Sequence, residues 1–230
     1  MTSDQAHLAV LPARGAGKAV VLVLHGGQEF GTDRVSGWAR PYLRMIPLAW
    51  AIHRVGRPHG IEVCRLRNRV RGWNAPKLDA VRDGRWALEQ IKDRHPDLPI
   101  VLVGHSMGGR VALRIADDPS VIGVCALAPW TTEKDWVSPV EGVKVLIAHG
   151  TSDVVTRAES SYEFAKRAFE VGTLARVELR GEGHSMVRRP ATWHRLVRAF
   201  VLDAFGFGPC DPLLADVWDL PPSERLAIAM

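Results

Sequence analysis

The chain has 230 residues, of which 47% are hydrophobic and 24% are charged, with a formal net charge of +5. This length and composition suit one globular domain with a substantial core and exclude global disorder. No apolar run approaches the roughly 18–20 residues that span a bilayer, and no basic segment with an apolar run follows the first methionine. We therefore expect a cytoplasmic protein without a membrane span. The basic residues are spread along the chain, which argues against nucleic-acid binding.

Cysteine and histidine usage gives no sign of a disulfide framework or a metal site. Three cysteines, Cys64, Cys125 and Cys210, cannot close such a framework, and the first two lie in apolar runs typical of buried strands. The chain contains no C-x-x-C pair and no clustered His/Cys spacing. We expect reduced thiols, no metal and no cofactor.

Apolar runs alternate with amphipathic stretches along the chain. The runs predict strands at 7–11, 19–24, 61–66, 100–103, 121–128, 143–148 and 174–179. The stretches predict helices at 38–55 (with a kink or break at Pro47), 79–94, 107–116, 156–171 and 190–205. This α/β alternation predicts a mostly parallel central sheet with helices on both faces, formed by residues 1–205 as a single domain. We expect residues 206–230 to form an extension that packs on the domain or is irregular.

One turn carries the strongest chemical signal. Gly104-His105-Ser106-Met107-Gly108 fits the G-x-S-x-G pattern between a predicted buried strand and a predicted helix. A serine on so sharp a turn needs a strained backbone, and the two glycines remove side chains that would otherwise collide there. The pattern predicts a nucleophilic Ser106 and a backbone N–H of Met107 that faces a developing oxyanion.

A serine nucleophile needs a base, and the base needs an orienting acid. Two later predicted strands run directly into polar loops that carry Asp153 and His184. The order Ser106, Asp153, His184 is the one expected for this elbow pattern, so we predict that these three residues form a catalytic triad. Three further histidines, at positions 25, 105 and 149, lie beside the same loops and are better explained by packing and hydrogen bonding. Glu182 is expected to be an exposed charge.

Two more loops are expected at the same edge of the sheet. The strand at 19–24 runs into His25-Gly26-Gly27-Gln28, a pattern that supplies a second oxyanion N–H, here from Gly27 or Gln28. The connection 129–142 is too short for a lid domain, which predicts an open cleft. Candidate pocket residues are the tryptophans Trp73, Trp130 and Trp136.

These motifs together resemble the α/β-hydrolase fold superfamily, in particular its small lidless esterases and dienelactone-hydrolase-like members. The resemblance covers residues 19–205 and rests on the loops that carry Gly26, Ser106, Asp153 and His184. A dienelactone hydrolase would carry a cysteine nucleophile where this chain has Ser106. The resemblance implies an α/β-hydrolase domain at 1–205 without a lid.

The predicted function is that of a serine hydrolase that cleaves carboxylic esters, or thioesters, through an acyl-enzyme on Ser106. An acyltransferase, an amidase or peptidase that uses the same triad, and a non-catalytic binder of small molecules are the alternatives. The arginines at 65, 67, 69 and 71 make an anionic ester conceivable, although exposed charges with local salt bridges are the simpler interpretation. The sequence leaves the oligomeric state open.

Overall fold

A single eight-stranded sheet organises the chain. The computed structural model describes residues 5–207 and 211–230. Its strands are β1 (His7–Leu11), β2 (Ala19–Leu24), β3 (Ile61–Arg67), β4 (Ile100–His105), β5 (Val121–Leu127), β6 (Lys144–Gly150), β7 (Thr173–Leu179) and β8 (Ile228–Ala229). They lie in the order β1-β3-β2-β4-β5-β6-β7-β8, with β1 antiparallel to β3 and every other neighbouring pair parallel. The predicted mostly parallel sheet is confirmed.

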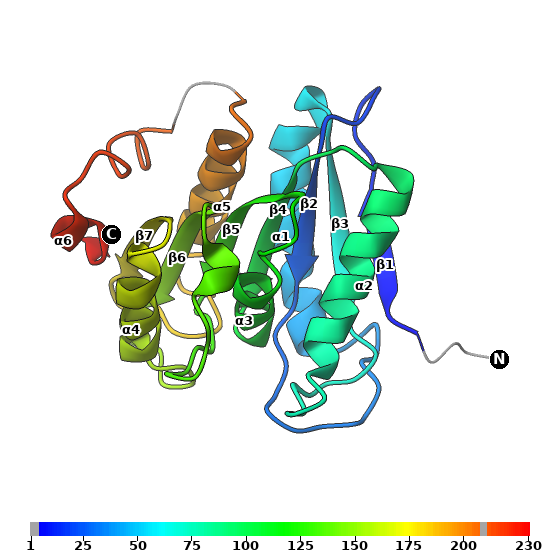
Figure 1. The fold of residues 1–230 in the computed structure, drawn as a ribbon, viewed down its shortest axis with the longest axis horizontal. Coiled ribbons are helices and arrows are strands. Elements are labelled where there is room, and N and C mark those ends of the chain that lie inside the picture. Colours follow the sequence, from blue (N-terminus) through cyan, green and yellow to red (C-terminus); the bar gives the residue numbers. More distant parts are fainter. Residues whose placement is uncertain (1–4, 208–210) are drawn as a thin grey trace.

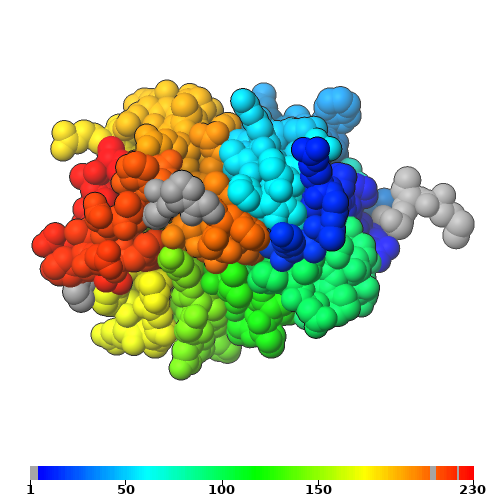
Figure 2. Space-filling view, turned by 90° about the horizontal axis from the view of Figure 1, so that it is seen from above, coloured from blue at the N-terminus to red at the C-terminus, as the bar shows by residue number. Residues whose placement is uncertain are grey.

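Helices cover both faces of this sheet, as predicted (Figure 1). They are α1 (Arg40–Gly56), α2 (Asp79–Arg94), α3 (Met107–Arg114), α4 (Ala158–Phe169), α5 (Pro190–Ala204) and the short α6 (Pro222–Arg225), with 3-10 turns at Arg57–His59 and Ser138–Val140. Figure 2 shows α1 and α5 on one side of the molecule and α2 and α4 on the other. The β5–β6 connection holds only one 3-10 turn, so no lid domain is inserted there.

The unbroken apolar character of the strands follows from this two-sided cover. In β2, Val20 and Leu22 pack in the core beneath α2, α3 and α4, whereas Val21 and Val23 pack in the core beneath α1 and α5. Successive side chains of a strand point to opposite faces, so both sets must be apolar. The two core layers hold the sheet rigidly between the helices.

Pro47 lies inside α1 and does not end it. A proline lacks the N–H of one helical hydrogen bond, which normally weakens a helix. Here the residues around it (Met45, Leu48, Ala49 and Ile52) are buried in the core. Tertiary packing of this face therefore keeps α1 in one piece, and the predicted break is absent.

The chain returns to the sheet after α5. β8 pairs in parallel with β7, the backbone N–H of Met230 donates to Glu178 O over 2.8 Å, and the N–H of Arg180 donates to Met230 O over 2.9 Å.

Cys64 and Cys125 are buried free thiols, and burial raises the pKa of Cys64 to about 12. Cys210 lies outside the described residues.

The order of the strands sets the position of the site. From β2 the chain moves to β3 on one side, then crosses to β4 on the other side of β2. The carboxyl ends of β2 and β4 therefore flank a topological switch point, where ligands bind in open α/β sheets. The loops that follow β2 and β6 lie along the lower edge of Figure 1.

In the described ranges, no helix has the length and hydropathy needed to cross a bilayer.

Candidate active site

Ser106 occupies a strained position between β4 and α3. Its backbone angles are φ 56° and ψ −120°, a backbone conformation that residues other than glycine rarely adopt. A Cβ on Gly104 would overlap the carbonyl oxygen of Gly108, and a Cβ on Gly108 would overlap that of Leu24. Glycine at both positions is therefore a steric requirement of the turn.

Asp153 and His184 lie together on the neighbouring loops after β6 and β7. His184 Nδ1 is 2.8 Å from Asp153 Oδ2, so the ring donates to the carboxylate through Nδ1. The other oxygen, Oδ1, accepts the backbone N–H groups of Val155 and Thr156 over 2.8 and 3.0 Å. Burial alone would raise the pKa of Asp153, but hydrogen bonds from His149, His184 and these N–H groups outweigh it and lower the pKa well below its usual range. The carboxylate is therefore an anion that holds the His184 ring in one tautomer.

Thr156 is a member of this cluster that the sequence analysis assigned only to the start of a helix. Its hydroxyl is 2.9 Å from Asp153 Oδ2, 3.1 Å from His184 Nδ1 and 3.2 Å from the Ala128 carbonyl oxygen. An Asp followed three residues later by Thr can form a local side-chain turn, which is the signal that could have identified it. Thr156 thus connects the loop after β6 to the end of β5.

The three histidines beside these loops are buried and engaged in hydrogen bonds, as predicted. His25 accepts the Asn68 N–H over 3.1 Å, and burial lowers its pKa to about 4. His105 Nε2 donates to the His184 carbonyl over 2.8 Å, and burial lowers its pKa to about 3. His149 Nε2 lies 3.1 Å from the Thr156 carbonyl and 3.3 Å from Asp153 Oδ2. These rings therefore connect the loops of the site.

The loop after β2 lies directly against the turn that carries Ser106. A Cβ on Gly26 would lie 3.2 Å from the Cβ of Ser106, and one on Gly27 would overlap the Met107 side chain. The backbone N–H of Gln28 donates to Arg71 O over 3.0 Å. Gln28 therefore already has a partner for its N–H group.

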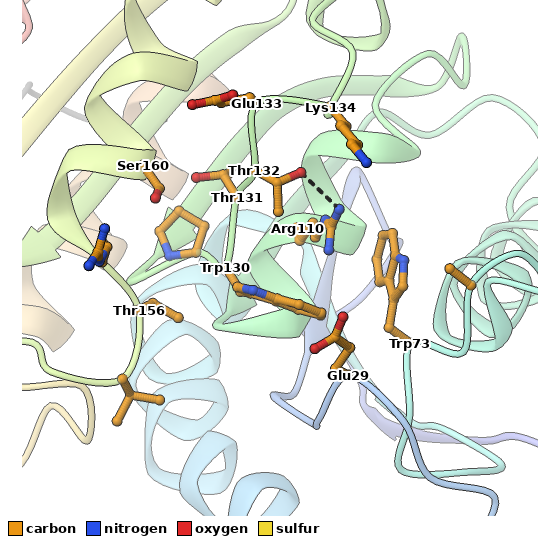
Figure 3. A pocket seen from close by; sticks show the side chains of 14 residues that line it. Glu29, Trp73, Arg110, Trp130, Thr131, Thr132, Glu133, Lys134, Thr156 and Ser160 are labelled. Carbon is orange, nitrogen blue, oxygen red and sulfur yellow. Dashed lines mark hydrogen bonds between the residues drawn. The ribbon is translucent and has the colours of Figure 1, made fainter.

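A cleft of about 780 Å³ is lined in part by the loops that follow β5 and β6 (Figure 3). Its lining includes Pro129, Trp130 and Thr156. The Trp130 N–H donates to Ser106 O over 3.2 Å, and Thr156 contacts His184, so these two residues join the cleft to the candidate triad. A cleft of this size admits a substrate of many atoms.

One wall of the cleft is an aromatic and cationic stack. The Arg110 guanidinium lies 4.2 Å from the ring centroid of Trp73 and 4.6 Å from that of Trp130. The same side chain donates to Thr132 Oγ1 and to Asp135 Oδ1 over 3.2 and 2.9 Å, the first of which Figure 3 marks. This stack holds both indoles in place. The third candidate pocket residue, Trp136, does not line this cleft and packs its exposed ring against Arg114.

Two charged side chains near the site, Glu182 and Arg69, have defined partners. Glu182 is fully buried, with Oε2 accepting the Trp193 indole N–H over 3.1 Å, so the expectation of an exposed charge was wrong. Glu182 lies against Gly150, where a Cβ on the glycine would overlap the Glu182 carbonyl oxygen. Arg69 pairs with Asp83 and Asp79 over 2.5 and 3.2 Å, as the salt-bridge interpretation of the arginine series predicts.

Among the described residues, no group of three His, Cys, Asp or Glu side chains is arranged to hold a metal ion.

Comparisons with known proteins identify the fold. A family model described as serine aminopeptidase, S33 matches residues 59–142, which is less than half of the chain. No curated protein sequence matches the chain. A putative α/β hydrolase from Agrobacterium tumefaciens superposes with a TM-score of 0.69 at 14% identity, covering 86% of this chain and 91% of the other.

Two further solved structures have similar architecture. A lidless α/β serine hydrolase from Xanthomonas campestris has a TM-score of 0.66 at 21% identity, and an esterase from Thermogutta terrifontis with bound propionate has 0.67 at 15% identity. Each comparison covers 89% of this chain and 91% of the other. Together with the parallel sheet, the glycine-flanked Ser106 turn and the short β5–β6 connection, these likenesses show that the chain has the α/β-hydrolase fold, with no lid domain between β5 and β6.

Proposed function

We propose that the protein is a serine hydrolase that cleaves carboxylic esters through an acyl-enzyme on Ser106. The observation that carries the proposal is the 2.8 Å hydrogen bond between His184 Nδ1 and Asp153 Oδ2, on loops beside the strained Ser106 turn. With Nδ1 engaged, Nε2 is the basic nitrogen that remains to take a proton from a serine hydroxyl.

In the proposed mechanism, Ser106 Oγ attacks the acyl carbon while its proton moves to His184 Nε2. Asp153, whose lowered pKa keeps it ionised, stabilises the imidazolium that forms. The imidazolium then protonates the leaving oxygen, and the alcohol departs. Water, deprotonated by the same nitrogen, attacks the acyl-enzyme and releases the acid.

The oxyanion would be bound by two backbone N–H groups. Met107 supplies one, because it opens α3 directly after the nucleophile. For the second, Gly27 is favoured over Gln28, because the Gln28 N–H already donates to Arg71 O. Gly27 packs against Met107, which brings the two donor residues together.

The test is covalent labelling. A fluorophosphonate probe should label the wild-type protein at Ser106, and Ser106→Ala should abolish both labelling and ester turnover. Equal labelling of the two proteins would overturn the assignment of the nucleophile. Turnover of p-nitrophenyl acetate, butyrate and octanoate then measures the preferred acyl length in the open cleft, and thioesters of matched length test the related bond.

A peptidase is the second candidate, because the matching family model is described as a serine aminopeptidase. An aminopeptidase needs an anion that binds the substrate ammonium group, and Glu29 and Glu133 both line the cleft. Aminoacyl p-nitroanilides distinguish the two: hydrolysis that exceeds that of the p-nitrophenyl esters and falls in Glu29→Gln would favour the peptidase.

A further inference from the structure

Exposed apolar side chains gather around the mouth of the candidate site. Eight large hydrophobic side chains are exposed in the described part of the chain, and five of them lie on the loops after β2, β6 and β7. These five, here called the rim residues, are Phe30, Trp38, Val154, Val155 and Val187. Val154 is 96% exposed and Trp38 is 84% exposed. Single exposed apolar residues are ordinary, but a set confined to one edge marks a contact surface.

The rim residues lie on both sides of Ser106. The sheet order places β4, which ends at the Ser106 turn, between β2 on one side and β6 and β7 on the other. Phe30 and Trp38 therefore belong to one side of the mouth, and the three valines to the other. Val155 also lines the cleft that contains Trp73 and Trp130, so the rim is continuous with the substrate cleft.

The exposed charges of the same loops are mainly positive. Arg40 at the start of α1, Arg157 before α4 and the pair Arg188 and Arg189 before α5 are all exposed. The exposed acidic residues of these three loops are Glu29 and Asp33, and Asp33 faces Arg71 at 3.9 Å; in the first turn of α4, Glu159 is a further exposed acid. Arg188 donates to the peptide carbonyl oxygen of Gly181, which carries no charge, and Arg189 donates to an oxygen of Met230 over 3.4 Å. The edge that carries the site thus combines apolar tips with a surplus of positive charge.

We propose that this edge docks on an anionic lipid surface. Aromatic and aliphatic loop tips partition into the boundary between headgroups and acyl chains, and arginines bind the phosphates around them. Neither the partitioning of the apolar tips nor the attraction of the arginines to phosphates gives strong binding alone, so binding needs both. This explains why apolar tips and cations share the same loops. A second copy of the chain is a poorer partner, because two edges with the same positive charge repel one another.

Docking in this orientation would bring the cleft mouth onto the lipid layer. An amphiphilic ester could then pass from the layer along Val155 to Trp130 and Ser106 without crossing water. Lipid-borne esters would then be the substrate class. This substrate class rests on the proposed ester hydrolysis, whereas the docking does not depend on it.

The test is co-sedimentation with vesicles, using Ser106→Ala as the background so that no lipid is consumed. Vesicles contain phosphatidylcholine alone or phosphatidylcholine mixed with phosphatidylglycerol. The rim variant is Trp38→Ser/Val154→Ser/Val187→Ser, and its matched control is Trp50→Ser/Val10→Ser, which removes exposed apolar groups from α1 and β1 away from the mouth. We expect the rim variant to bind mixed vesicles at least about tenfold more weakly, the control to bind as the background does, and added salt to weaken binding.

Three outcomes would overturn docking: equal binding of the rim variant and the control, no preference for the anionic vesicles, or a change in oligomeric mass in the rim variant with no change in vesicle binding. The last would assign the edge to contacts between copies. In the protein that keeps Ser106, turnover of soluble p-nitrophenyl butyrate should be the same with and without the rim substitutions. Vesicle binding combined with an absence of esterase activity in the wild-type protein would refute the proposed function and leave the docking intact.

Discussion

Thr156 offers the sharpest test of how the site is held together. Thr156→Val removes the hydroxyl and keeps the shape of the side chain. Asp153 Oδ2 and the Ala128 carbonyl oxygen, which lie 2.9 and 3.2 Å from this hydroxyl, then lose the single donor that they share. A hydrogen bond to a charged group contributes about 1.5–3 kcal/mol. If this stabilisation grows as the imidazolium forms, its loss lowers kcat/KM by about ten- to a hundredfold.

The assay is p-nitrophenyl butyrate hydrolysis across the pH plateau, together with urea unfolding. Thr156→Ser is the matched control, because it keeps the hydroxyl and loses only a methyl group. We expect Thr156→Ser to retain most of the activity and Thr156→Val to lose about 1–3 kcal/mol of unfolding free energy as well, since a buried carbonyl is left unpaired. Wild-type turnover in Thr156→Val, or an equal loss in both variants, would refute the reasoning.

Two further measurements follow from the geometry. Burial lowers the pKa of His25 and His105 to about 4 and about 3, so the folded state stays neutral where the unfolded state binds protons. The contribution of these two histidines to the free energy of unfolding should be fully present above about pH 6.5 and fall below it by about 1.4 kcal/mol per pH unit for each. His105→Gln should reduce the slope of unfolding free energy against pH in urea titrations, and an unchanged slope would contradict the assignment. In Gly108→Ala the new Cβ overlaps the Leu24 carbonyl, so we expect at least about 2 kcal/mol of destabilisation with loss of turnover. A wild-type melting temperature would show that the turn can relax.

The fold was predictable because its signals are local. Each parallel strand is covered on both faces, so β2 and β4 appear in the sequence as short unbroken apolar runs, and the amphipathic helix at 79–94 has the predicted bounds. The two-residue strand β8 was not predicted, because so short a strand has no periodicity and exists only by pairing with β7. Pro47 likewise needed tertiary information, since core packing overrides its local preference.

The candidate site was predictable only as far as strand ends reveal it. In a parallel sheet the carboxyl ends of the strands meet at one edge, so Asp153 and His184 could be brought together from their order alone. The roles of the neighbouring groups depend on packing between loops. Glu182 is buried because Gly150 admits the loop closely, and the sequence around it contains nothing that indicates this approach. Which of the three tryptophans line the cleft also depends on Arg110, which stacks on two of them.

The short strand β8 has a consequence for the motions of the site. Met230 accepts hydrogen bonds from the N–H of Arg180 and the guanidinium of Arg189, the two ends of the loop that carries His184. A two-residue strand at the edge of a sheet opens at far lower free energy than the central strands, in brief local unfolding events. Each such event breaks the hydrogen bonds between Met230 and the two ends of the loop while β4 and β6 remain folded. The two hydrogen bonds that Met230 accepts from this loop therefore break more readily than the strand pairing that positions the Ser106 turn.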